Sequence, residues 1–347
     1  VRAAPPVRRT GKSVGVVGSG PAGLAAAQQL NRAGHHVTVY EKDDRLGGLI
    51  RYGIPEYKMD TAILERRLRQ LEEEGIEFRP NCHAGVDLPA EELRDSHDAL
   101  VLAVGAMKAR DLDIPGRELG GIHMAMDYLT LQNRRCEGDE IPDEEFISAA
   151  DKHVVIIGGG DTGADCLGTA HRQGAKSVVQ LWLYPEPPKA RMSDNPWPLW
   201  PNIFRISPAH EEGGKWEYSV ATTAFRGTPD GRVQALQGVR VKVERQADGS
   251  RVVTEVPGSE FEIPADLVLL AIGFAGPQPE GLISDLGLEL TSRGSLKIDS
   301  RRMTSSPGVF AAGDATLGAS IIVWAIAEGR QVARSVDEYL MGESLLP

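Results

Sequence analysis

Apolar and polar positions near the start of the chain alternate in a way that predicts a strand, a tight turn and a helix. VGVV at 14–17 is a short apolar run that favours a buried strand. GSGPAG at 18–23 follows with the glycine spacing G-x-G-x-x-G, and an alanine- and leucine-rich helix is predicted from there to about Ala33. VTVY at 37–40 predicts the next strand. This order of elements predicts a parallel βαβ unit.

The same succession recurs in the middle of the chain. VVII at 154–157 predicts a strand, GGGDTG at 158–163 repeats the glycine spacing, and a helix over 164–173 precedes a strand over 177–183. One glycine-rich turn is a weak signal. Two such turns, each between a predicted strand and a predicted helix, indicate that both have the same kind of function. We therefore expect two domains of one kind, in agreement with a length of 347 residues, which exceeds what one core usually serves.

Further apolar runs predict how these domains are connected. The runs at 99–105 and 266–273 both end in Ala, a β-branched residue and Gly, and we interpret them as the strands at which the chain crosses between domains. GVFAAGD at 308–314 predicts a strand that leads into Gly-Asp, and a helix is expected over 321–337. The predicted fold class is α/β with two Rossmann-like dinucleotide-binding domains, the first discontinuous because the second is inserted within it.

The first glycine turn has the residues that a dinucleotide site needs. Gly18 permits the sharp turn, Gly20 lets the backbone approach a pyrophosphate, and Gly23 lets the helix pack on the strand. The helix N-terminus offers free N–H groups and roughly half a positive charge to phosphates. Glu41 lies 18 residues after Gly23, where this fold expects an acidic residue that accepts a hydrogen bond from a ribose hydroxyl.

Two features favour FAD as the first nucleotide. Gly47 and Gly48 follow Glu41 closely, and a glycine pair lets the backbone lie against a bulky ligand. Asp314 stands at a predicted strand end, where its carboxylate can hold ribityl hydroxyls. The N-terminus of the following helix can lie under the electron-rich edge of the flavin and stabilise its reduced form by about 1 kcal/mol.

The second turn is predicted to bind a nicotinamide nucleotide. Flavin and nicotinamide are the pair that makes chemical sense, since a hydride passes directly between them and the protein only aligns them. We therefore predict no catalytic side chain. The choice between NADPH and NADH stays open, because the position equivalent to Glu41 lies close to Trp182, which is neither a carboxylate nor an arginine. Lys189 and Arg191 could reach a 2′-phosphate or could equally be surface charges.

Composition excludes several other functions. A net charge of −11 argues against nucleic-acid binding, and no apolar run approaches the ~20 residues of a membrane helix. Cys82, Cys136 and Cys166 have no close spacing, which excludes a C-x-x-C pair and a cluster ligand set, predicts no metal site and suits a reducing cytoplasm. His35 and His36 precede a strand and are expected at the surface.

In these motifs and their order, the chain resembles the small (β) subunit of glutamate synthase and the matching region of single-chain glutamate synthases. The resemblance covers nearly the whole chain, and its YGIP and NPWPLWP segments are more specific than the glycine motifs. It is carried by GSGPAGLAAAQQL at 18–30, YEKDDRLGGLIRYGIPEYKMD at 40–60, RRLRQLEEEGIEF at 66–78, IIGGGDTGADCLGTAHRQGAKSV at 156–178, NPWPLWPNIFR at 195–205 and VFAAGDATLGASIIVWAIAEGR at 309–330.

The resemblance implies a fold of the glutathione-reductase type and a role in glutamate synthesis. Members of this family oxidise NAD(P)H and pass electrons through iron–sulfur clusters to the large subunit, which is the partner implied here. Their N-terminal cysteine-rich domain, which ligates the clusters, has no counterpart in this chain, so clusters are expected only in that missing region. The missing initial Met favours a fragment over a natural loss of the domain.

The predicted domains and site residues follow from these patterns. Residues 1–12 are expected as a linker, 13–110 and 275–347 as the FAD domain, and 111–274 as the NAD(P)H domain. The residues predicted to hold FAD are Gly18, Gly20, Pro21, Ala22, Gly23, Glu41, Gly48, Leu49, Gly105, Gly313, Asp314, Ser320 and Ile322. Those predicted to hold NAD(P)H are Gly158, Gly160, Asp161, Thr162, Gly163 and Gly273.

Two alternatives remain open on the sequence. One is a related NAD(P)H oxidoreductase whose acceptor is a ferredoxin or another iron–sulfur protein. The other is a docking subunit that keeps its nucleotides only for structure. Both glycine turns are intact, which argues against the second alternative, and a colourless purified protein would revive it.

Overall fold

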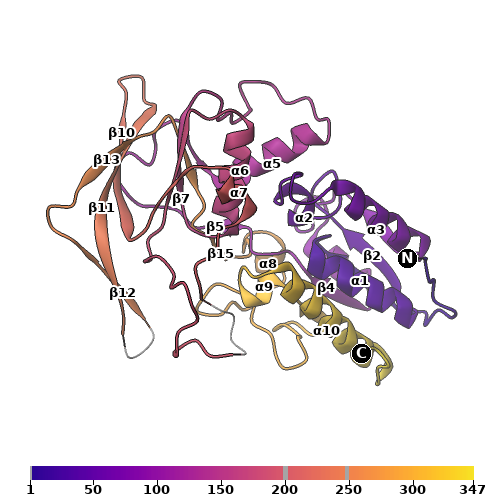
Figure 1. The fold of residues 1–347 in the computed structure, drawn as a ribbon. Helices are drawn as coiled ribbons and strands as arrows, with labels where there is room; N and C mark the ends of the chain where they lie inside the picture. The colour runs from indigo at the N-terminus through magenta and orange to yellow at the C-terminus, as the bar shows by residue number, and fades with distance from the viewer. Residues whose placement is uncertain (1, 198–201, 247–249) are drawn as a thin grey trace. The chain divides into compact units, whose positions relative to one another are not determined.

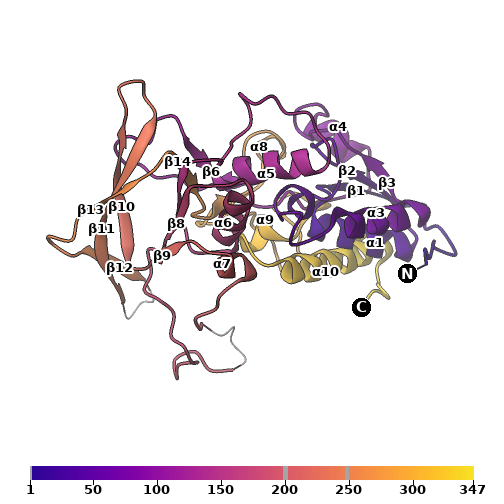
Figure 2. The same ribbon diagram turned by 45° about the horizontal axis from the view of Figure 1, so that its top comes forward.

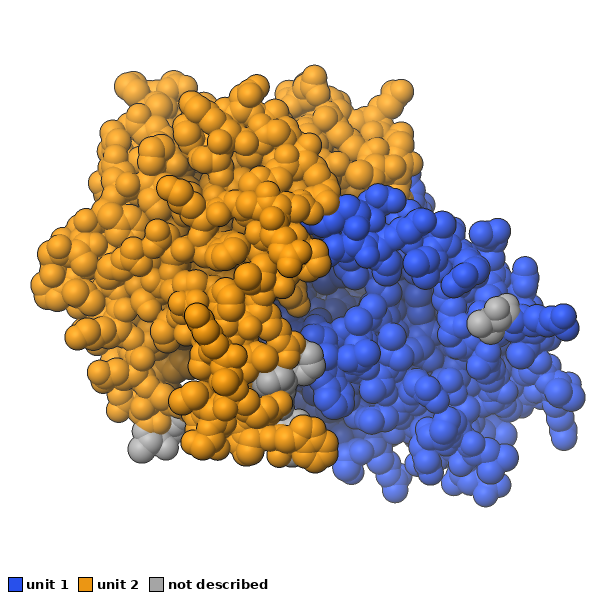
Figure 3. All heavy atoms as spheres, in the orientation of Figure 1, with its two compact units in different colours: residues 1–110, 273–347 blue, residues 111–272 orange. Residues whose placement is uncertain are grey.

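A computed structural model gives the fold, and it describes residues 2–197, 202–246 and 250–347. The chain forms two compact units, which Figure 3 colours separately: unit 1 comprises Val1–Arg110 and Gly273–Pro347, and unit 2 comprises Asp111–Ile272. The first unit is thus discontinuous, and the second is inserted into it. In the part of the chain described, no helix is long and apolar enough to cross a membrane.

Unit 1 is built on a five-stranded parallel sheet in the order β16-β4-β1-β2-β3. Its strands are β1 (Ser13–Val17), β2 (His36–Tyr40), β3 (Glu77–Arg79), β4 (Ala99–Leu102) and β16 (Val309–Ala311). The direction in which the strands are added reverses between β1 and β4. Nucleotides bind beyond the carboxyl ends of the strands at such a reversal, and the first glycine turn lies there, directly after β1.

Helices cover both faces of this sheet. One face packs against α1 (Pro21–Ala33), α3 (Thr61–Glu73) and α10 (Ile322–Met341), and Figures 1 and 2 show α1 and α10 side by side. A Cβ at Gly329 of α10 would collide with the carbonyl oxygen of Ala22 in α1, so this glycine permits the close approach. The other face packs against α4 (Ala90–Asp95) and α8 (Leu282–Asp285). Shorter elements are α2 (Leu49–Tyr52), α9 (Asp314–Leu317), β5 (Lys108–Ala109) and β15 (Phe274–Gly276).

Unit 2 repeats the arrangement with a parallel sheet in the order β6-β14-β7-β8-β9. Its strands are β6 (Ile122–Met124), β7 (His153–Ile157), β8 (Ser177–Leu181), β9 (Lys215–Glu217) and β14 (Leu267–Leu270). Its helices are α5 (Ala125–Cys136), α6 (Asp161–Arg172) and α7 (Pro208–Glu211). The second glycine turn joins β7 to α6, at the reversal between β7 and β14.

A second, antiparallel sheet in unit 2 was not predicted from the sequence. It comprises β10 (Val220–Gly227), β11 (Val233–Arg245), β12 (Arg251–Glu255) and β13 (Phe261–Pro264). Its apolar residues Phe225 and Leu236 share a core with Val155 and Val268 of the parallel sheet. This sheet therefore covers a face on which helices are usual in such folds.

Observed element bounds differ from the predicted ones mainly at helix ends. The helix predicted over 164–173 already begins at Asp161, because the glycine turn itself supplies its first residues. The helix predicted over 321–337 runs from Ile322 to Met341 and ends where Gly342 adopts a left-handed conformation with φ 86°.

The prediction for His35 was wrong. Its side chain is 0% exposed, whereas the neighbouring His36 is exposed. His35 Nε2 lies 2.9 Å from Asp337 Oδ1 of α10, and His35 Nδ1 lies 2.9 Å from Thr10 Oγ1. The turn after α1 places His35 against the C-terminal helix, a contact between residues 302 positions apart that the local pattern does not contain.

The segment expected as a linker is hydrogen-bonded to unit 1. Arg9 Nη1 donates to Asn31 Oδ1 and to the carbonyl oxygen of His35, at 2.8 and 2.6 Å. The Ala4 amide donates to a carboxylate oxygen of Glu74 at 3.3 Å. The segment before β1 is therefore held against α1 and the end of α3.

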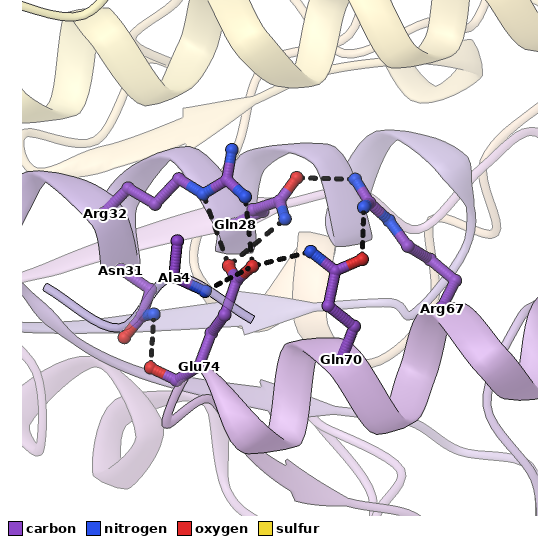
Figure 4. A network of polar contacts seen from close by, with 7 residues as sticks. All are labelled: Ala4, Gln28, Asn31, Arg32, Arg67, Gln70 and Glu74. Carbon is purple, nitrogen blue, oxygen red and sulfur yellow. Dashed lines mark hydrogen bonds and ion pairs between the residues drawn. The ribbon is translucent and has the colours of Figure 1, made fainter. Parts of the chain in front are cut away.

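Glu74 is the centre of a buried polar network between α1 and the end of α3 (Figure 4). Its carboxylate accepts hydrogen bonds from Gln28, Arg32 and Gln70, besides the Ala4 amide. Burial alone would raise the pKa of Glu74, but these hydrogen bonds outweigh it, and the pKa lies below its usual value. The network thus holds an ionised carboxylate inside the protein.

We expect Glu74→Gln to lower the free energy of unfolding by about 2 kcal/mol at neutral pH, because buried donors lose a charged acceptor. A depressed carboxyl pKa contributes stability above the unfolded pKa of about 4.3, and this contribution is lost as pH falls through the folded pKa. The difference in free energy of unfolding between the wild type and Glu74→Gln should therefore shrink in urea unfolding curves recorded at increasingly acid pH. Exposed Glu73→Gln is the matched control and should change stability by less than about 0.5 kcal/mol.

Two candidate dinucleotide sites

The first glycine turn has the geometry that its spacing predicts. Gly18 has φ 100°, and a Cβ there would collide with the carbonyl oxygen of Ala103. A Cβ at Gly23 would collide with the carbonyl oxygen of Gly18, so close packing requires both glycines, Gly18 against Ala103 and Gly23 within the turn itself. Gly20 is different, because a Cβ there would meet no described atom within 4 Å. The space that a side chain at Gly20 would occupy is therefore free of described atoms.

That open space lies at the N-terminus of α1. Gly20 is the N-cap residue, Pro21 opens the helix, and no side chain of the described residues caps it. The first N–H groups are therefore available to a ligand, and the helix dipole favours an anion there. These residues fit the pyrophosphate of a dinucleotide.

Glu41 lies at the end of β2, as predicted, but its carboxylate already has partners. It is 5% exposed, and its Oε2 accepts hydrogen bonds from Ser19 N at 3.0 Å and Ser19 Oγ at 2.5 Å. Its Oε1 accepts from Asp43 N at 3.0 Å. An ionised carboxylate offers about four acceptor sites, so a ribose hydroxyl can still be accommodated, and this role for Glu41 stays a prediction.

Sequence reasoning missed Ser19, the residue that joins these parts. Besides its bonds to Glu41, Ser19 Oγ accepts a hydrogen bond from Gly47 N at 2.9 Å. This places Gly48 beside the turn, with a hypothetical Cβ 3.1 Å from the Cα of Gly20. Gly48 has φ 52° and precedes Leu49, the first residue of α2. A small hydroxyl residue between the first two glycines was the available signal.

Residues of the C-terminal segment of unit 1 lie close to the same turn. Gly313 has φ 75°, and a Cβ there would lie 2.8 Å from the Cβ of Ala22. Asp314 Oδ1 accepts hydrogen bonds from Ser320 N at 3.1 Å and Ser320 Oγ at 2.7 Å. Ile322 then begins α10, whose N-terminus has no side-chain cap among the described residues. Gly105 follows β4 with φ 69°. The predicted FAD residues thus gather at the carboxyl ends of β1, β4 and β16.

Asp314 provides a test of this arrangement. Burial raises its pKa, and the bonds from Ser320 only partly offset that effect. A carboxyl group with a raised pKa makes its full contribution to the free energy of unfolding below its pKa in the unfolded chain, about 3.9. This contribution is lost as pH rises through the pKa of the folded protein. Above its folded pKa, the charge of Asp314 therefore destabilises the FAD-free protein.

We expect Asp314→Asn to raise the melting temperature of the FAD-free protein at pH 7, with the difference vanishing in acid. The same change should weaken FAD binding about tenfold, because a charged acceptor for hydroxyl groups is lost. Thermal melts across pH and a fluorescence titration with FAD measure the two effects. Unchanged FAD affinity would show that Asp314 does not contact the ribityl chain.

The second glycine turn has the same geometry in unit 2. Gly158 has φ 129°, and a Cβ there would collide with the carbonyl oxygen of Ala271. Gly163 is closed in by Gly158 and by Gln180, whereas a Cβ at Gly160 would meet nothing within 4 Å in the described chain. Gly160 is the N-cap of α6, and no described side chain caps that helix. A second pyrophosphate fits here.

The remaining residues predicted to hold NAD(P)H are Asp161, Thr162 and Gly273. Asp161 and Thr162 form the first turn of α6, with Asp161 exposed. Gly273 follows β14 with φ 87° and is the first residue of the second segment of unit 1. Sequence reasoning missed Gln180, whose Nε2 donates to the carbonyl oxygen of Gly158 at 2.7 Å and whose Oε1 lies 2.8 Å from His210 Nε2. A polar residue at an inward position of a buried strand was the signal.

Trp182 stands at the end of β8, the position that Glu41 has at the end of β2. A Cβ at Gly159 would collide with the indole ring of Trp182, so the ring lies directly against the glycine turn. The ring of Tyr218 packs on Trp182 with 5.1 Å between centroids. An aromatic surface therefore replaces the acidic residue that would bind a free 2′-hydroxyl. Lys189 and Arg191 are exposed.

The cysteines of the described chain form no disulfide bond. Cys82, Cys136 and Cys166 are all free thiols. No group of three or more potential metal ligands occurs within residues 2–197, 202–246 and 250–347. What the geometry offers is two sites of one architecture, each able to take a dinucleotide.

Comparisons with known proteins agree with this architecture. The sequence matches the family described as Pyridine nucleotide-disulphide oxidoreductase over residues 12–192 and 228–332. Among solved structures, FprA of Mycobacterium tuberculosis in complex with NADPH has a TM-score of 0.76 at 18% identity, covering 95% of this chain and 85% of FprA. A thioredoxin reductase of T. acidophilum has a TM-score of 0.64 at 20% identity, covering 95% and 99%. At these identities the likeness concerns the fold alone.

Closer relatives are found among proteins of known sequence. The glutamate synthase [NADPH] small chain of Mycobacterium tuberculosis is 57% identical over 100% of this chain and 70% of its own length. The corresponding small chain of Bacillus subtilis is 48% identical over 99% of this chain and 70% of its own. The glutamate synthase [NADH] of Schizosaccharomyces pombe is 46% identical over 99% of this chain and 17% of its own length.

The fold and the two sites define an oxidoreductase of the pyridine nucleotide-disulphide oxidoreductase class. Its cofactors are FAD and NAD(P)H, as predicted. Within that class, the chain belongs to the glutamate synthase small-chain family. The resemblance inferred from the sequence is thereby confirmed, and the chain is an NAD(P)H-dependent flavin oxidoreductase.

Proposed function

We propose that this chain oxidises NADPH and supplies the electrons, through iron–sulfur clusters, to a glutamate synthase large subunit. The observation that carries the proposal is the pair of open glycines, Gly20 and Gly160, each at an uncapped helix N-terminus. The names of the relatives at 57% and 48% identity support the assignment to glutamate synthesis. Such chemistry belongs in the cytoplasm, where thiols such as these three stay reduced.

In this proposal the protein binds and orients, and no side chain transfers a proton. Bound FAD supplies the redox chemistry, because it accepts electrons in pairs as a hydride and releases them to an acceptor. Gly20 at the start of α1 would hold its pyrophosphate in the turn that Gly18 and Gly23 allow to form, and Asp314 would hold the ribityl chain. Gly160 at the start of α6 would hold the second pyrophosphate in the turn that Gly158 and Gly163 allow to form. The clusters are held by cysteines outside these 347 residues, since the three present are scattered.

NADPH is proposed over NADH for a physical reason. Trp182 takes the place of the carboxylate that would bind a free 2′-hydroxyl and would repel a 2′-phosphate. Its ring lies against Gly159 and carries no charge of its own. The bacterial relatives named for NADPH are consistent with this choice, although the yeast relative at 46% identity is named for NADH.

An anaerobic visible spectrum of the purified chain, recorded before and after each nucleotide, tests the proposal. We expect flavin absorbance that bleaches rapidly with NADPH and more slowly with NADH. Bleaching by NADH alone would overturn the nucleotide assignment, and a colourless protein that does not take up added FAD would favour a docking subunit. Glutamate formation on adding the large subunit and the cluster-bearing polypeptide tests the acceptor; reduction of a ferredoxin in its place would favour the related oxidoreductase.

A further inference from the structure

The antiparallel sheet of unit 2 ends in an open two-stranded ribbon. The first half of β11 pairs with β10 on one side and β13 on the other, whereas residues 241–245 of β11 pair with β12 alone. Among the described residues, β12 pairs with no strand other than β11. Figures 1 and 2 show the ribbon extending from the rest of the sheet. No strand in the described part of the chain therefore pairs with the other edge of β12.

Hydrogen bonds at both ends of the ribbon show which backbone groups face this open edge. Gln246 N donates to Ser250 O at 2.9 Å, and Val256 N donates to Arg240 O at 2.8 Å. Hydrogen-bonded pairs alternate along an antiparallel ladder. Both of these bonds join even-numbered residues. The even-numbered residues of β12 therefore direct their N–H and C=O groups toward β11. The odd-numbered residues direct their N–H and C=O groups away from it.

These outward residues form a self-complementary series. They are Arg251, Val253 and Glu255, and all five residues of β12 are exposed. We propose that β12 pairs antiparallel with β12 of a second copy of this chain, about a two-fold axis through Val253. Each Arg251 then lies opposite Glu255 of the second copy, so opposite charges meet at both ends. Isologous pairing of this kind needs only one surface patch, which serves both copies.

The same register also aligns apolar side chains. Val243 of β11 lies opposite Val253 of β12 within one chain. Two-fold pairing therefore sets four valines in a row across the four strands, two from each copy. Val252 and Val253 are 46% and 42% exposed in the single chain. Cross-strand pairs of β-branched residues and of opposite charges stabilise a sheet, and they fix its register.

A second copy explains this edge better than a foreign strand does. Charged residues on an edge strand usually prevent pairing, but here their order is the one that its own antiparallel copy complements. A pairing of five residues buries less than the ~1,200 Å² of a standard interface, so the dimer is expected to be reversible at micromolar concentrations. This inference is independent of the proposed redox chemistry.

Charge reversal with sedimentation velocity tests the pairing on the FAD-loaded 347-residue chain. We expect a reversible dimer with a dissociation constant below about 100 µM. Arg251→Glu and Glu255→Arg each set like charges opposite one another at both ends, and each should raise the dissociation constant at least about tenfold. An equimolar mixture of the two variants should dimerise again, because each then meets the opposite charges of the other. The double variant should also dimerise.

Two controls separate the pairing from other effects of these changes. The guanidinium of Arg251 lies 4.4 Å from the ring centroid of Tyr184, so Tyr184→Ala removes this stack and should leave the dimer intact. Exposed Lys242→Glu on β11 changes the charge of the ribbon away from the open edge and should also have no effect. A wild-type monomer at every concentration overturns the proposal. So does a dimer that neither single variant weakens, or a mixture that stays monomeric.

Discussion

Replacing Gly20 with valine is expected to give a folded protein that contains no FAD. Gly20 has φ −69°, which any residue can adopt, and a Cβ there meets no described atom within 4 Å. The FAD-free fold should therefore tolerate the side chain. The valine would occupy the space where the pyrophosphate approaches the backbone, and FAD affinity should fall at least about a hundredfold, which corresponds to about 2.8 kcal/mol. Flavin absorbance per protein after purification, and titration with added FAD, measure the loss.

Gly23→Val is the contrasting change in the same turn. A Cβ at Gly23 collides with the carbonyl oxygen of Gly18, so this variant should be destabilised even without FAD. Comparing melting temperatures of the FAD-free proteins separates the two roles of glycine: Gly20→Val should match the wild type, and Gly23→Val should melt earlier. A Gly20→Val protein that stays yellow would mean that the first turn does not bind the flavin nucleotide.

Replacing Gly160 with valine is expected to keep the flavin and abolish its reduction. Gly160 has φ −88° and the same open surroundings as Gly20, so the fold should again accept the side chain. The obstructed site is now that of NAD(P)H. The rate of flavin reduction at subsaturating NADPH, followed anaerobically by stopped flow, should fall at least about a hundredfold, while bound FAD per protein remains at the wild-type level.

The two valine variants act as controls for one another. A general effect of valine in a glycine turn would make both proteins colourless or both unstable, whereas separate sites make one colourless and the other yellow but unreactive. Reduction of Gly160→Val at the wild-type rate would contradict the assignment of the second turn to the nicotinamide nucleotide.

Much of the architecture follows from local sequence patterns. Both glycine turns, the strands before them and the helices after them were predicted, and α1 ends at Ala33 as predicted, although it begins at Pro21, within the glycine turn. These elements are predictable because a tight turn with positive φ requires glycine at Gly18 and Gly158, and because parallel strands buried on both faces are continuously apolar. The insertion of one unit in the other could also be predicted, from the similar endings of the strands at 99–105 and 266–273.

The candidate sites were predicted less completely than the turns. Ser19 and Gln180 were missed, although Ser19 joins Glu41 to the loop before Gly48 and Gln180 supports the carbonyl of Gly158. Both act through partners 22 or more positions away, and no local period records such contacts. His35 was misplaced for the same reason, since its partner Asp337 lies near the other end of the chain.

By itself, then, the sequence determined that this protein has two nucleotide-binding units of one kind, where each turn lies and to which family the chain is similar. Only the tertiary structure decided that, among the described residues, Gly20 and Gly160 are open while their neighbouring glycines are enclosed, that Trp182 lies against the second turn, and that one edge of β12 is unpaired. The reason is physical. Backbone conformation and burial period are local properties of the chain, whereas free space, hydrogen-bond partners and strand edges depend on which distant segments meet.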